Sequence, residues 1–343
     1  MSSITIDLGA GDDALELEET LTDLLRFNGV VIGLEGGVGD DSLTGPIADS
    51  SWSVTSENTG ALAIGATPIV NFTNTENLVG RGIDTLAGPD QATTWNVTGE
   101  DSGNLQNGSS TLINFSGIPH LSGGSGDDTF NIIDSGVVGD GGQLSGPLDG
   151  GGGTDTIDYS GYDHEILISV ALSVGTALES FTNVESFVGG NHNYTTPGLT
   201  ESATSAVRIG ERVQVGDRIY TYIGENDLTP LSLAPLTIEN SPNGVLYEDT
   251  NFWAISTGNT ILGDAGENSW SITGADAGSI NGVASFSNFQ IATGSTGLDT
   301  FTFADGGSLS GGVDGGGVVN STSQQIVCRR RFRSAKRYCW MTH

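Results

Sequence analysis

The fold is indicated most clearly by residues 52–78, WSVTSENTGALAIGATPIVNFTNTENL. The apolar side chains of this stretch come in short alternating pairs: Trp52/Val54, Leu62/Ile64 and Val70/Phe72. Alternation with a period of two residues, interrupted by Gly, Asn and Ser, predicts short half-buried strands. Strands this short cannot build a conventional sandwich core, but coils stacked along an axis bury one continuous apolar column. The sequence therefore predicts an all-β fold, a parallel β-solenoid of irregular repeats.

Three tryptophans open similar units along the chain. The units begin with Trp52-Ser53-Val54-Thr55, Trp95-Asn96-Val97-Thr98-Gly99 and Trp270-Ser271-Ile272-Thr273-Gly274. The second and third units continue to agree as far as residues 140–152 and 305–317. The first two tryptophans are 43 residues apart, which fits two coils of about 21 residues each. We expect tryptophans and phenylalanines to stack inside the solenoid, with Asp and Thr on the outside.

A second echo defines an insert. Residues 72–80, FTNTENLVG, match residues 181–189, FTNVESFVG, but the expected continuation of the second copy arrives only at residue 259. The intervening segment also has a different composition, with four of the nine prolines of the chain. The sequence predicts solenoid repeats over 1–190 and 259–320, a small inserted β module over 191–258, and a basic tail over 321–343.

The segment from Asp13 to Phe27 fits two structures. Leu17, Leu21 and Leu24 have helical spacing, whereas the run that starts at Ala14 alternates like a strand. The sequence leaves both interpretations open.

Charge and composition exclude several classes of partner. The chain has 53 Gly, 42 acidic and 11 basic residues, and six of the basic residues lie beyond Asn320. Nucleic acids and anionic membranes are bound through Lys and Arg, so we expect neither as a partner of the body. No apolar run is long enough for a membrane helix. Dense carboxylates instead favour bound cations or a salty medium, and a body without cysteine suits an oxidising exterior.

Three segments combine a glycine-rich turn with an aspartate and a following apolar residue. They are Gly36-Gly37-Val38-Gly39-Asp40-Asp41-Ser42-Leu43, Gly123-Gly124-Ser125-Gly126-Asp127-Asp128-Thr129-Phe130 and Gly150-Gly151-Gly152-Gly153-Thr154-Asp155-Thr156-Ile157. Looser versions end at Asp13, Asp84 and Asp299. Glycine permits the positive φ angles of a tight turn, and carbonyl and carboxylate oxygens are the ligands that Ca²⁺ prefers. The candidate calcium-site residues are Gly36, Gly39, Asp41, Gly123, Gly126, Asp128, Gly150, Gly153 and Asp155.

These turns resemble those of the RTX (repeats-in-toxin, hemolysin-type calcium-binding) family of secreted bacterial proteins. The tryptophan-opened units look like those of large bacterial surface adhesins of filamentous-haemagglutinin type. The resemblance implies a calcium-binding, secreted or cell-surface repeat protein with an adhesive role. In the RTX family the turns follow one another in tandem, whereas here the aspartates of successive motifs are 28, 43, 44, 27 and 144 residues apart. A single turn offers part of a calcium shell, so the rest must come from a neighbouring coil or water. The alternative is a plain turn in which Asp bonds backbone N–H groups.

Catalytic groups are scarce. His120, His164 and His192 are isolated, and residues 1–320 contain neither Cys nor Lys. Adjacent acids such as Asp40 and Asp41 point apart in a strand or turn, which argues against an acid–base dyad. We therefore expect no enzyme activity. A carbohydrate-active β-helix enzyme of lyase or epimerase type remains the alternative, because such enzymes use parallel β-helices.

The insert suggests a different ligand. Tyr220, Tyr222 and Trp253 could stack on sugar rings and form a glycan-binding platform, or could instead form the core of a small module. The segment also faintly resembles small chitin-binding domains. Surface glycans or another cell-surface receptor are the corresponding partners.

The tail departs from the repeat pattern. Residues 321–343 are rich in Arg and contain Cys328 and Cys339. A nucleic-acid patch, a disulfide or half a metal site would each fit these residues. We interpret the tail instead as a frame-shifted, disordered end of a fragment whose native repeats continue. Taken together, the sequence predicts a non-catalytic, calcium-binding segment of a large extracellular bacterial repeat protein.

Overall fold

The computed structural model describes residues 2–134, 141–162, 166–170, 172–190, 212–215, 218–222, 253–255, 258–264, 266–295, 297, 299–315 and 326–327. The chain forms two compact units. Unit 1 consists of Met1–Asp158 and Ala177–Val184, and unit 2 consists of Tyr159–Thr176 and Glu185–His343. We describe each unit by itself.

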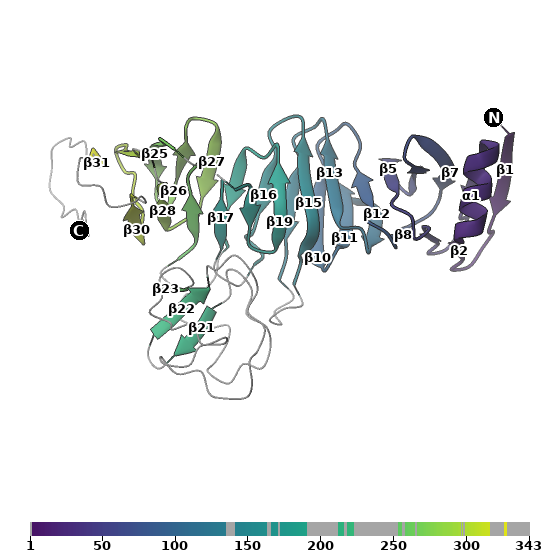
Figure 1. Cartoon of the computed structure of the whole chain (residues 1–343), viewed down its shortest axis with the longest axis horizontal. Coiled ribbons are helices and arrows are strands. Elements are labelled where there is room, and N and C mark those ends of the chain that lie inside the picture. The colour runs from purple at the N-terminus through teal and green to yellow at the C-terminus, as the bar shows by residue number, and fades with distance from the viewer. Residues whose placement is uncertain are drawn as a thin grey trace. The chain divides into compact units, whose positions relative to one another are not determined.

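Unit 1 is built from two sheets, and its chain alternates between them (Figure 1). In order across the first sheet, the strands are β1 (Ser2–Asp7), β3 (Val30–Glu35), β7 (Thr67–Thr73), β6 (Thr59–Ile64), β5 (Ser51–Ser56), β9 (Thr85–Ala87), β13 (His120–Gly124), β15 (Leu144–Gly151) and β19 (Leu178–Thr182). Across the second sheet they are β2 (Ala14–Glu16), β4 (Ser42–Thr44), β8 (Asn77–Val79), β12 (Ser110–Ser116), β11 (Ser102–Asn107), β10 (Thr94–Gly99), β14 (Thr129–Ile132) and β16 (Thr156–Asp158). Coil-to-coil pairs such as β1–β3, β4–β8 and β13–β15 are parallel. The predicted all-β fold of parallel β-solenoid type is confirmed.

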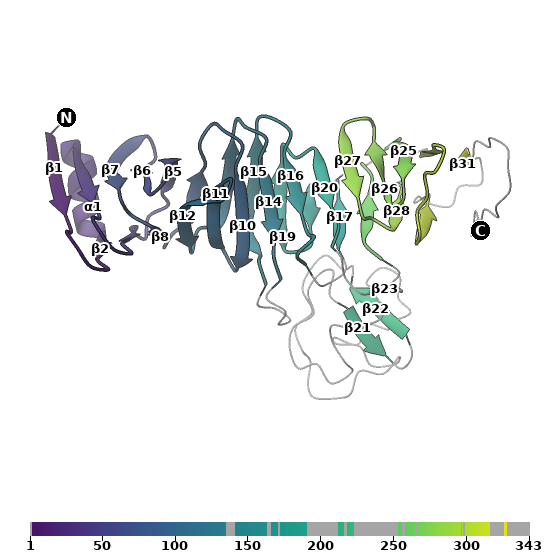
Figure 2. The same ribbon diagram turned by 180° about the vertical axis from the view of Figure 1, so that it is seen from behind.

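The tryptophan-opened units differ from the prediction. Each is an antiparallel three-stranded meander, β5–β6–β7 in the first sheet and β10–β11–β12 in the second, rather than a pair of stacked coils. Figure 2 shows β10, β11 and β12 side by side, as their pairing requires. The first and last strands of each meander pair in parallel with neighbouring coils, so the meander replaces one coil strand with three. Alternating apolar residues look the same in both arrangements, and for this reason the sequence pattern did not separate them.

A continuous column of apolar side chains forms the core of unit 1. In the first sheet, each member pairs in register with the next across neighbouring strands, and the column runs Ile32, Val70, Leu62, Trp52, Leu86, Leu121, Leu148, Phe181. All of these side chains are buried. Neighbouring coils therefore cover one another along the axis, as the solenoid prediction required.

Aromatic stacking inside the core also agrees with the prediction. Trp95 of β10 stacks on Phe130 of β14, with ring centroids 5.7 Å apart and planes inclined by 13°. In unit 2, Trp270 stacks on Phe301 with a centroid separation of 5.2 Å. The two pairs occupy equivalent places in the second and third tryptophan units.

An outward-facing row of polar residues crosses the second sheet of unit 1. One residue from each of six adjacent strands lies in register: Asn77, Asn114, Asn104, Asn96, Asn131 and Asp158. Asn131 donates from Nδ2 to Oδ1 of Asn96 at 2.8 Å, and Asn96 donates in turn to Oδ1 of Asn104 at 2.9 Å. These amide bonds link a coil strand to the meander and hold both in register.

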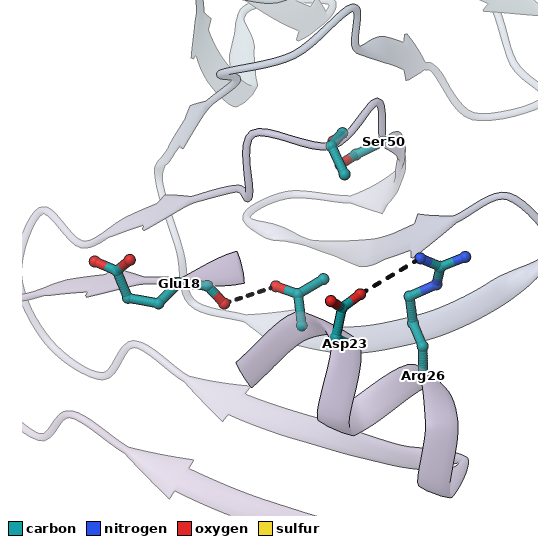
Figure 3. Close-up of polar contacts among 6 residues, drawn as sticks. Glu18, Asp23, Arg26 and Ser50 are labelled. Atoms are coloured by element: carbon teal, nitrogen blue, oxygen red, sulfur yellow. Dashed lines mark hydrogen bonds and ion pairs between the residues drawn. The ribbon is translucent and has the colours of Figure 1, made fainter. Parts of the chain in front are cut away.

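The segment from Asp13 to Phe27, for which the sequence left a strand and a helix open, contains both. The strand β2 is followed by helix α1 (Glu19–Asn28), which ends at Gly29 in the left-handed conformation. Leu25 is buried, whereas Phe27 is exposed. Figure 3 shows Glu18 at the start of the helix and the ion pair between Asp23 and Arg26 on its surface, with a 3.9 Å separation.

Unit 2 repeats the two-sheet arrangement. Its first sheet contains β18 (Val174–Gly175), β17 (Leu167–Ser169), β24 (Thr260–Leu262), β28 (Ile291–Thr293) and β30 (Gly312–Asp314). Its second contains β20 (Ser186–Val188), β27 (Ala284–Ser287), β26 (Ala277–Ile280), β25 (Ser269–Gly274), β29 (Thr300–Phe303) and β31 (Ile326–Val327). The strands β25, β26 and β27 form the third tryptophan meander.

The segment predicted as an insert contains a sheet of its own. Among its described residues, β21 (Arg212–Val215), β22 (Arg218–Tyr222) and β23 (Trp253–Ile255) pair in antiparallel fashion. The predicted start of this module, residue 191, lies outside the described residues, as do most residues up to its predicted end at 258. Most of the predicted tail, 321–343, lies outside them as well.

Candidate functional site

The glycine–aspartate turns of unit 1 lie in two stacked pairs. In the first pair, residues 9–13 lie against residues 37–41, one coil further along the solenoid. Gly11 donates its N–H to the carbonyl oxygen of Val38 at 2.8 Å, and Val38 donates to the carbonyl of Gly9 at 2.9 Å. In the second pair, Gly152 donates to the carbonyl of Gly124 at 2.8 Å. The spacings of 28 and 27 residues between the aspartates are therefore single coils, and a neighbouring turn is present at each pair, as a shared calcium site would need.

The predicted site glycines serve two structural purposes. Gly39 and Gly153 adopt positive φ angles, 149° and 119°, which L side chains rarely adopt. Gly36, Gly123 and Gly150 instead lie against the next coil, where a Cβ atom would overlap with a backbone carbonyl oxygen. Gly126 likewise has no room for a Cβ, because the backbone of Gln91 and Ala92 lies against it. The turns thus bring the backbones of adjacent coils into direct contact.

The aspartates of the three full motifs are buried inside these turns. Asp41, Asp128 and Asp155 have relative exposures of 0%, 1% and 0%. In each carboxylate Oδ1 accepts a backbone N–H from the equivalent turn of the preceding coil. The N–H of Asp13 donates to Asp41 at 2.9 Å, that of Thr93 to Asp128 at 2.7 Å, and that of Asp128 to Asp155 at 2.8 Å. The carboxylates therefore form a relay along the solenoid axis, which is the role that the plain-turn alternative assigned to them.

The second carboxylate oxygens divide the turns into two classes. Oδ2 of Asp84 accepts N–H groups from Arg81 at 2.9 Å and Gly82 at 3.2 Å, and Oδ2 of Asp299 accepts the N–H of Ser295 at 2.8 Å. In contrast, Oδ2 of Asp41 and Oδ2 of Asp128 are buried and have no hydrogen-bond partner among the described residues. The plain-turn interpretation accounts fully for Asp84 and Asp299, but it leaves these two oxygens unexplained.

Each of these two oxygens borders a glycine position that a carbonyl oxygen of the next coil also borders. A Cβ added to Gly123 would meet both the Gly150 carbonyl oxygen and Oδ2 of Asp128. At Gly36 the same position meets the carbonyl oxygen of Asn74 and Oδ2 of Asp41. Burial raises the pKa of the Asp128 carboxyl, although hydrogen bonds from Thr93 act in the opposite direction. Two buried acceptors side by side repel each other unless a cation or a proton lies between them.

Carboxylate and carbonyl oxygens are ligands that a hard cation such as Ca²⁺ prefers, but here they are not joined by a cluster of ligating side chains. No group of three or more His, Cys, Asp or Glu side chains in the described part of the chain is arranged to hold a metal ion. A calcium ion at Asp41 or Asp128 would therefore depend on backbone carbonyls and water for most of its shell.

The sequence pattern missed several residues of the relay. Glu76 accepts the N–H of Asp41 through Oε2 at 2.8 Å, and in unit 2 two of the acceptors, Asn259 and Gln290, are amides rather than carboxylates. Ile166 donates to Oδ1 of Asn259 at 3.0 Å, and Asn259 donates to Oε1 of Gln290 at 2.8 Å. A search for aspartate cannot find these positions, although the FVGG run at 187–190 that echoes the first repeat marks the coil before Asn259.

For the predicted glycan-binding residues Tyr220, Tyr222 and Trp253, the structure describes the strands but not the side chains. Tyr220 and Tyr222 lie on β22, and Tyr222 pairs in register with Trp253 of β23. Their side chains lie outside the described residues, so the glycan-platform hypothesis stays a prediction. Cys328 and Cys339 also lie outside them. His120 is half-buried beside Thr85, with 3.5 Å between Nδ1 and Oγ1.

No protein family matches the sequence, and no curated protein matches it. No helix in the described part of the chain is long and apolar enough to cross a membrane.

Proposed function

We propose that this chain is a non-catalytic, calcium-stabilised solenoid segment of a large secreted or cell-surface bacterial repeat protein, with a structural or adhesive role. The observation that carries the calcium proposal is the pair of buried, unpartnered oxygens on Asp41 and Asp128. The extracellular setting and adhesive role rest on the resemblance of the turns to secreted calcium-binding repeats.

Calcium suits these oxygens for a physical reason. Each borders a glycine position that a backbone carbonyl oxygen of the next coil also borders, and Ca²⁺ binds carboxylate and carbonyl oxygens together. A bound cation would replace the repulsion between the two oxygens with attraction and offset the burial of the carboxylate charge. The ion would then link two adjacent coils, and its binding free energy would add to the stability of the fold.

A non-catalytic role is supported by how neighbouring acids are arranged. Asp41 is buried whereas Asp40 is exposed, and the same holds for Asp128 and Asp127. The two carboxylates of each pair therefore face different environments and cannot share a substrate as an acid–base dyad.

Thermal unfolding of the full chain with calcium or with chelator tests the proposal. We expect calcium at about 100 times its dissociation constant to stabilise the fold by about 2.7 kcal/mol per site. In the double variant Asp41→Asn/Asp128→Asn the stabilisation should be lost, because each Asn replaces the carboxylate and supplies an N–H of its own.

The control is Glu57→Gln, which removes one charge at an exposed position in the turn between β5 and β6. It should keep the calcium response. Unfolding temperature and circular dichroism that do not change with calcium in the wild-type chain would overturn the proposed function.

A further inference from the structure

The turn at Asn259 in unit 2 reproduces the relay of the Asp128 turn with an amide in place of the carboxylate. Thr93 donates its backbone N–H to Oδ1 of Asp128, as Ile166 donates to Oδ1 of Asn259. The N–H of Asp128 then bonds Asp155 at 2.8 Å, as the N–H of Asn259 bonds Gln290 at 2.8 Å. The two side chains therefore hold equivalent positions in their coils.

The second side-chain atom distinguishes the two turns. Nδ2 of Asn259 donates to the carbonyl oxygens of Gly190 and Asn288, both at 2.8 Å. A Cβ added to Gly189 would meet the Asn288 carbonyl oxygen and this same Nδ2, just as one added to Gly123 would meet the Gly150 carbonyl oxygen and Oδ2 of Asp128. An N–H donor thus occupies in unit 2 the place where unit 1 has an oxygen without a donor.

We infer that the calcium requirement is confined to unit 1, and that Asn259 supplies in unit 2, through its own N–H, the link between coils that a cation supplies at Asp128. This inference rests on the proposed function of the Asp41 and Asp128 turns. It adds that Asn in place of Asp removes the need for a cation in a turn whose backbone offers no donor to the second side-chain atom. The turns of Asp84 and Asp299 do offer such donors.

The remaining aspartate turn of unit 2 agrees with this assignment. Asp299 accepts the backbone N–H of Asn268 at 3.0 Å and its Nδ2 at 2.7 Å through Oδ1. Its Oδ2 accepts from Ser295. Among the described residues of unit 2, no buried carboxylate oxygen lacks a donor, so no turn there calls for a positive charge.

Hydrogen exchange of the full wild-type chain, resolved by peptide, tests the inference. Calcium should slow exchange at least tenfold in peptides covering 30–50 and 85–130, relative to chelator, and change it less than twofold in peptides covering 259–292. Equal slowing in both units would overturn the inference while supporting calcium binding. No slowing in either unit would overturn the proposed function and the inference with it.

Substitution of Asn259 gives a second test. Asn259→Asp removes the donor to Asn288 and Gly190 and should make the 259–292 peptides calcium-dependent, with faster exchange in chelator and recovery in calcium. The control Ser287→Asp places the same charge at an exposed site on β27 and should leave exchange unchanged. Faster exchange in Asn259→Asp that calcium does not reverse would overturn the inference, because the position would then not bind a cation.

Discussion

At the scale of single residues, the meander glycines hold close backbone contacts that no other residue can make. Gly103 lies in β11 where a Cβ would overlap with the carbonyl oxygen of Asn96 in β10. Gly60 and Gly278 lie against Ser53 and Ser271 in the same way in the other two meanders. The repeated glycine therefore fixes how closely the first two strands of each tryptophan unit approach.

Gly103→Ala should destabilise unit 1 by about 3 kcal/mol, because the added methyl group overlaps with backbone that is fixed by strand pairing. Gly108 is the matched control, since it has a φ of 60° and no atom within 4 Å of an added Cβ. Gly108→Ala should cost about 1 kcal/mol for its left-handed backbone alone. Urea unfolding measures both losses, and equal values would contradict the close contact.

The buried phenol of Tyr159 should make the stability of unit 2 depend on pH. Burial, with a smaller effect from Tyr162, raises the pKa of the Tyr159 phenol well above its ordinary value, and its hydroxyl donates to the carbonyl of Thr176 at 2.7 Å. The unfolded chain releases this proton near pH 10, whereas the folded chain retains it. The stabilisation is therefore complete below about pH 10 and lost as the pH rises further.

Tyr159→Phe should flatten this alkaline loss of stability while costing about 1 kcal/mol at pH 7 for the lost hydrogen bond. Unfolding curves at pH 7, 9 and 11 measure both effects. An alkaline loss of the same size in the variant would assign the titration to another group.

The glycine–aspartate turns were predictable from the sequence, but the stacking of one turn on another was not. The glycines follow from the need for positive φ angles and close backbone approach. The role of Asp41, Asp128 and Asp155 as calcium ligands stays a prediction. The stacking of one turn on another does not follow, because the coil from Asp13 to Asp41 includes helix α1. A helix inserted in a coil adds residues without increasing the distance between that coil and the next. The number of residues between Asp13 and Asp41 therefore does not reveal that their turns are in contact.

At the scale of elements, the amide row joins a meander to the coil strand beside it. Asn96 both donates to Asn104 and accepts from Asn131. Asn96→Ala removes both bonds and should destabilise unit 1 by about 1–2 kcal/mol. Thr98→Ala, at an exposed position of the same strand, should cost less than half as much. Thermal unfolding measures both, and equal losses would show that the row adds nothing beyond strand propensity.

The meanders mark the limit of the sequence pattern at this scale. The alternation of Trp95 and Val97 predicted a half-buried strand, and the structure has one in which both side chains are buried. Strand direction is not encoded in alternation, so parallel coils and antiparallel meanders give the same pattern. The agreement of residues 140–146 with 305–311 has a tertiary cause that sequence alone does not show. Asp101 in one meander turn accepts from the backbone and hydroxyl of Ser145, and Asp276 does the same with Ser310.

At the scale of the whole molecule, charge is strongly unbalanced. The chain has 42 acidic and 11 basic residues, and the ion pairs of its described residues are Arg26 with Asp23 and Arg81 with Glu16. Repulsion among exposed carboxylates lowers stability and is screened by salt.

Raising NaCl from 10 mM to about 0.5 M should therefore increase the unfolding temperature by several degrees in the presence of chelator. Calcium at constant ionic strength should add to that increase, because site binding and screening are separate effects. An unfolding temperature independent of NaCl would show that exposed carboxylate repulsion is already relieved in the folded chain.

The placement of the first two meanders has a consequence for how such an array can lengthen. Each meander adds two strands to its own sheet, or about 10 Å at the usual strand spacing. Since β5–β7 extends one sheet of unit 1 and β10–β12 extends the other, both sheets contain four strands between the coil of β3 and β4 and the coil of β13 and β14. A gene duplication that copied one meander alone would leave one sheet longer than the other. The apolar side chains of the two sheets would then no longer face each other at that point of the core. Recombination should therefore gain or lose meanders in pairs, one for each sheet.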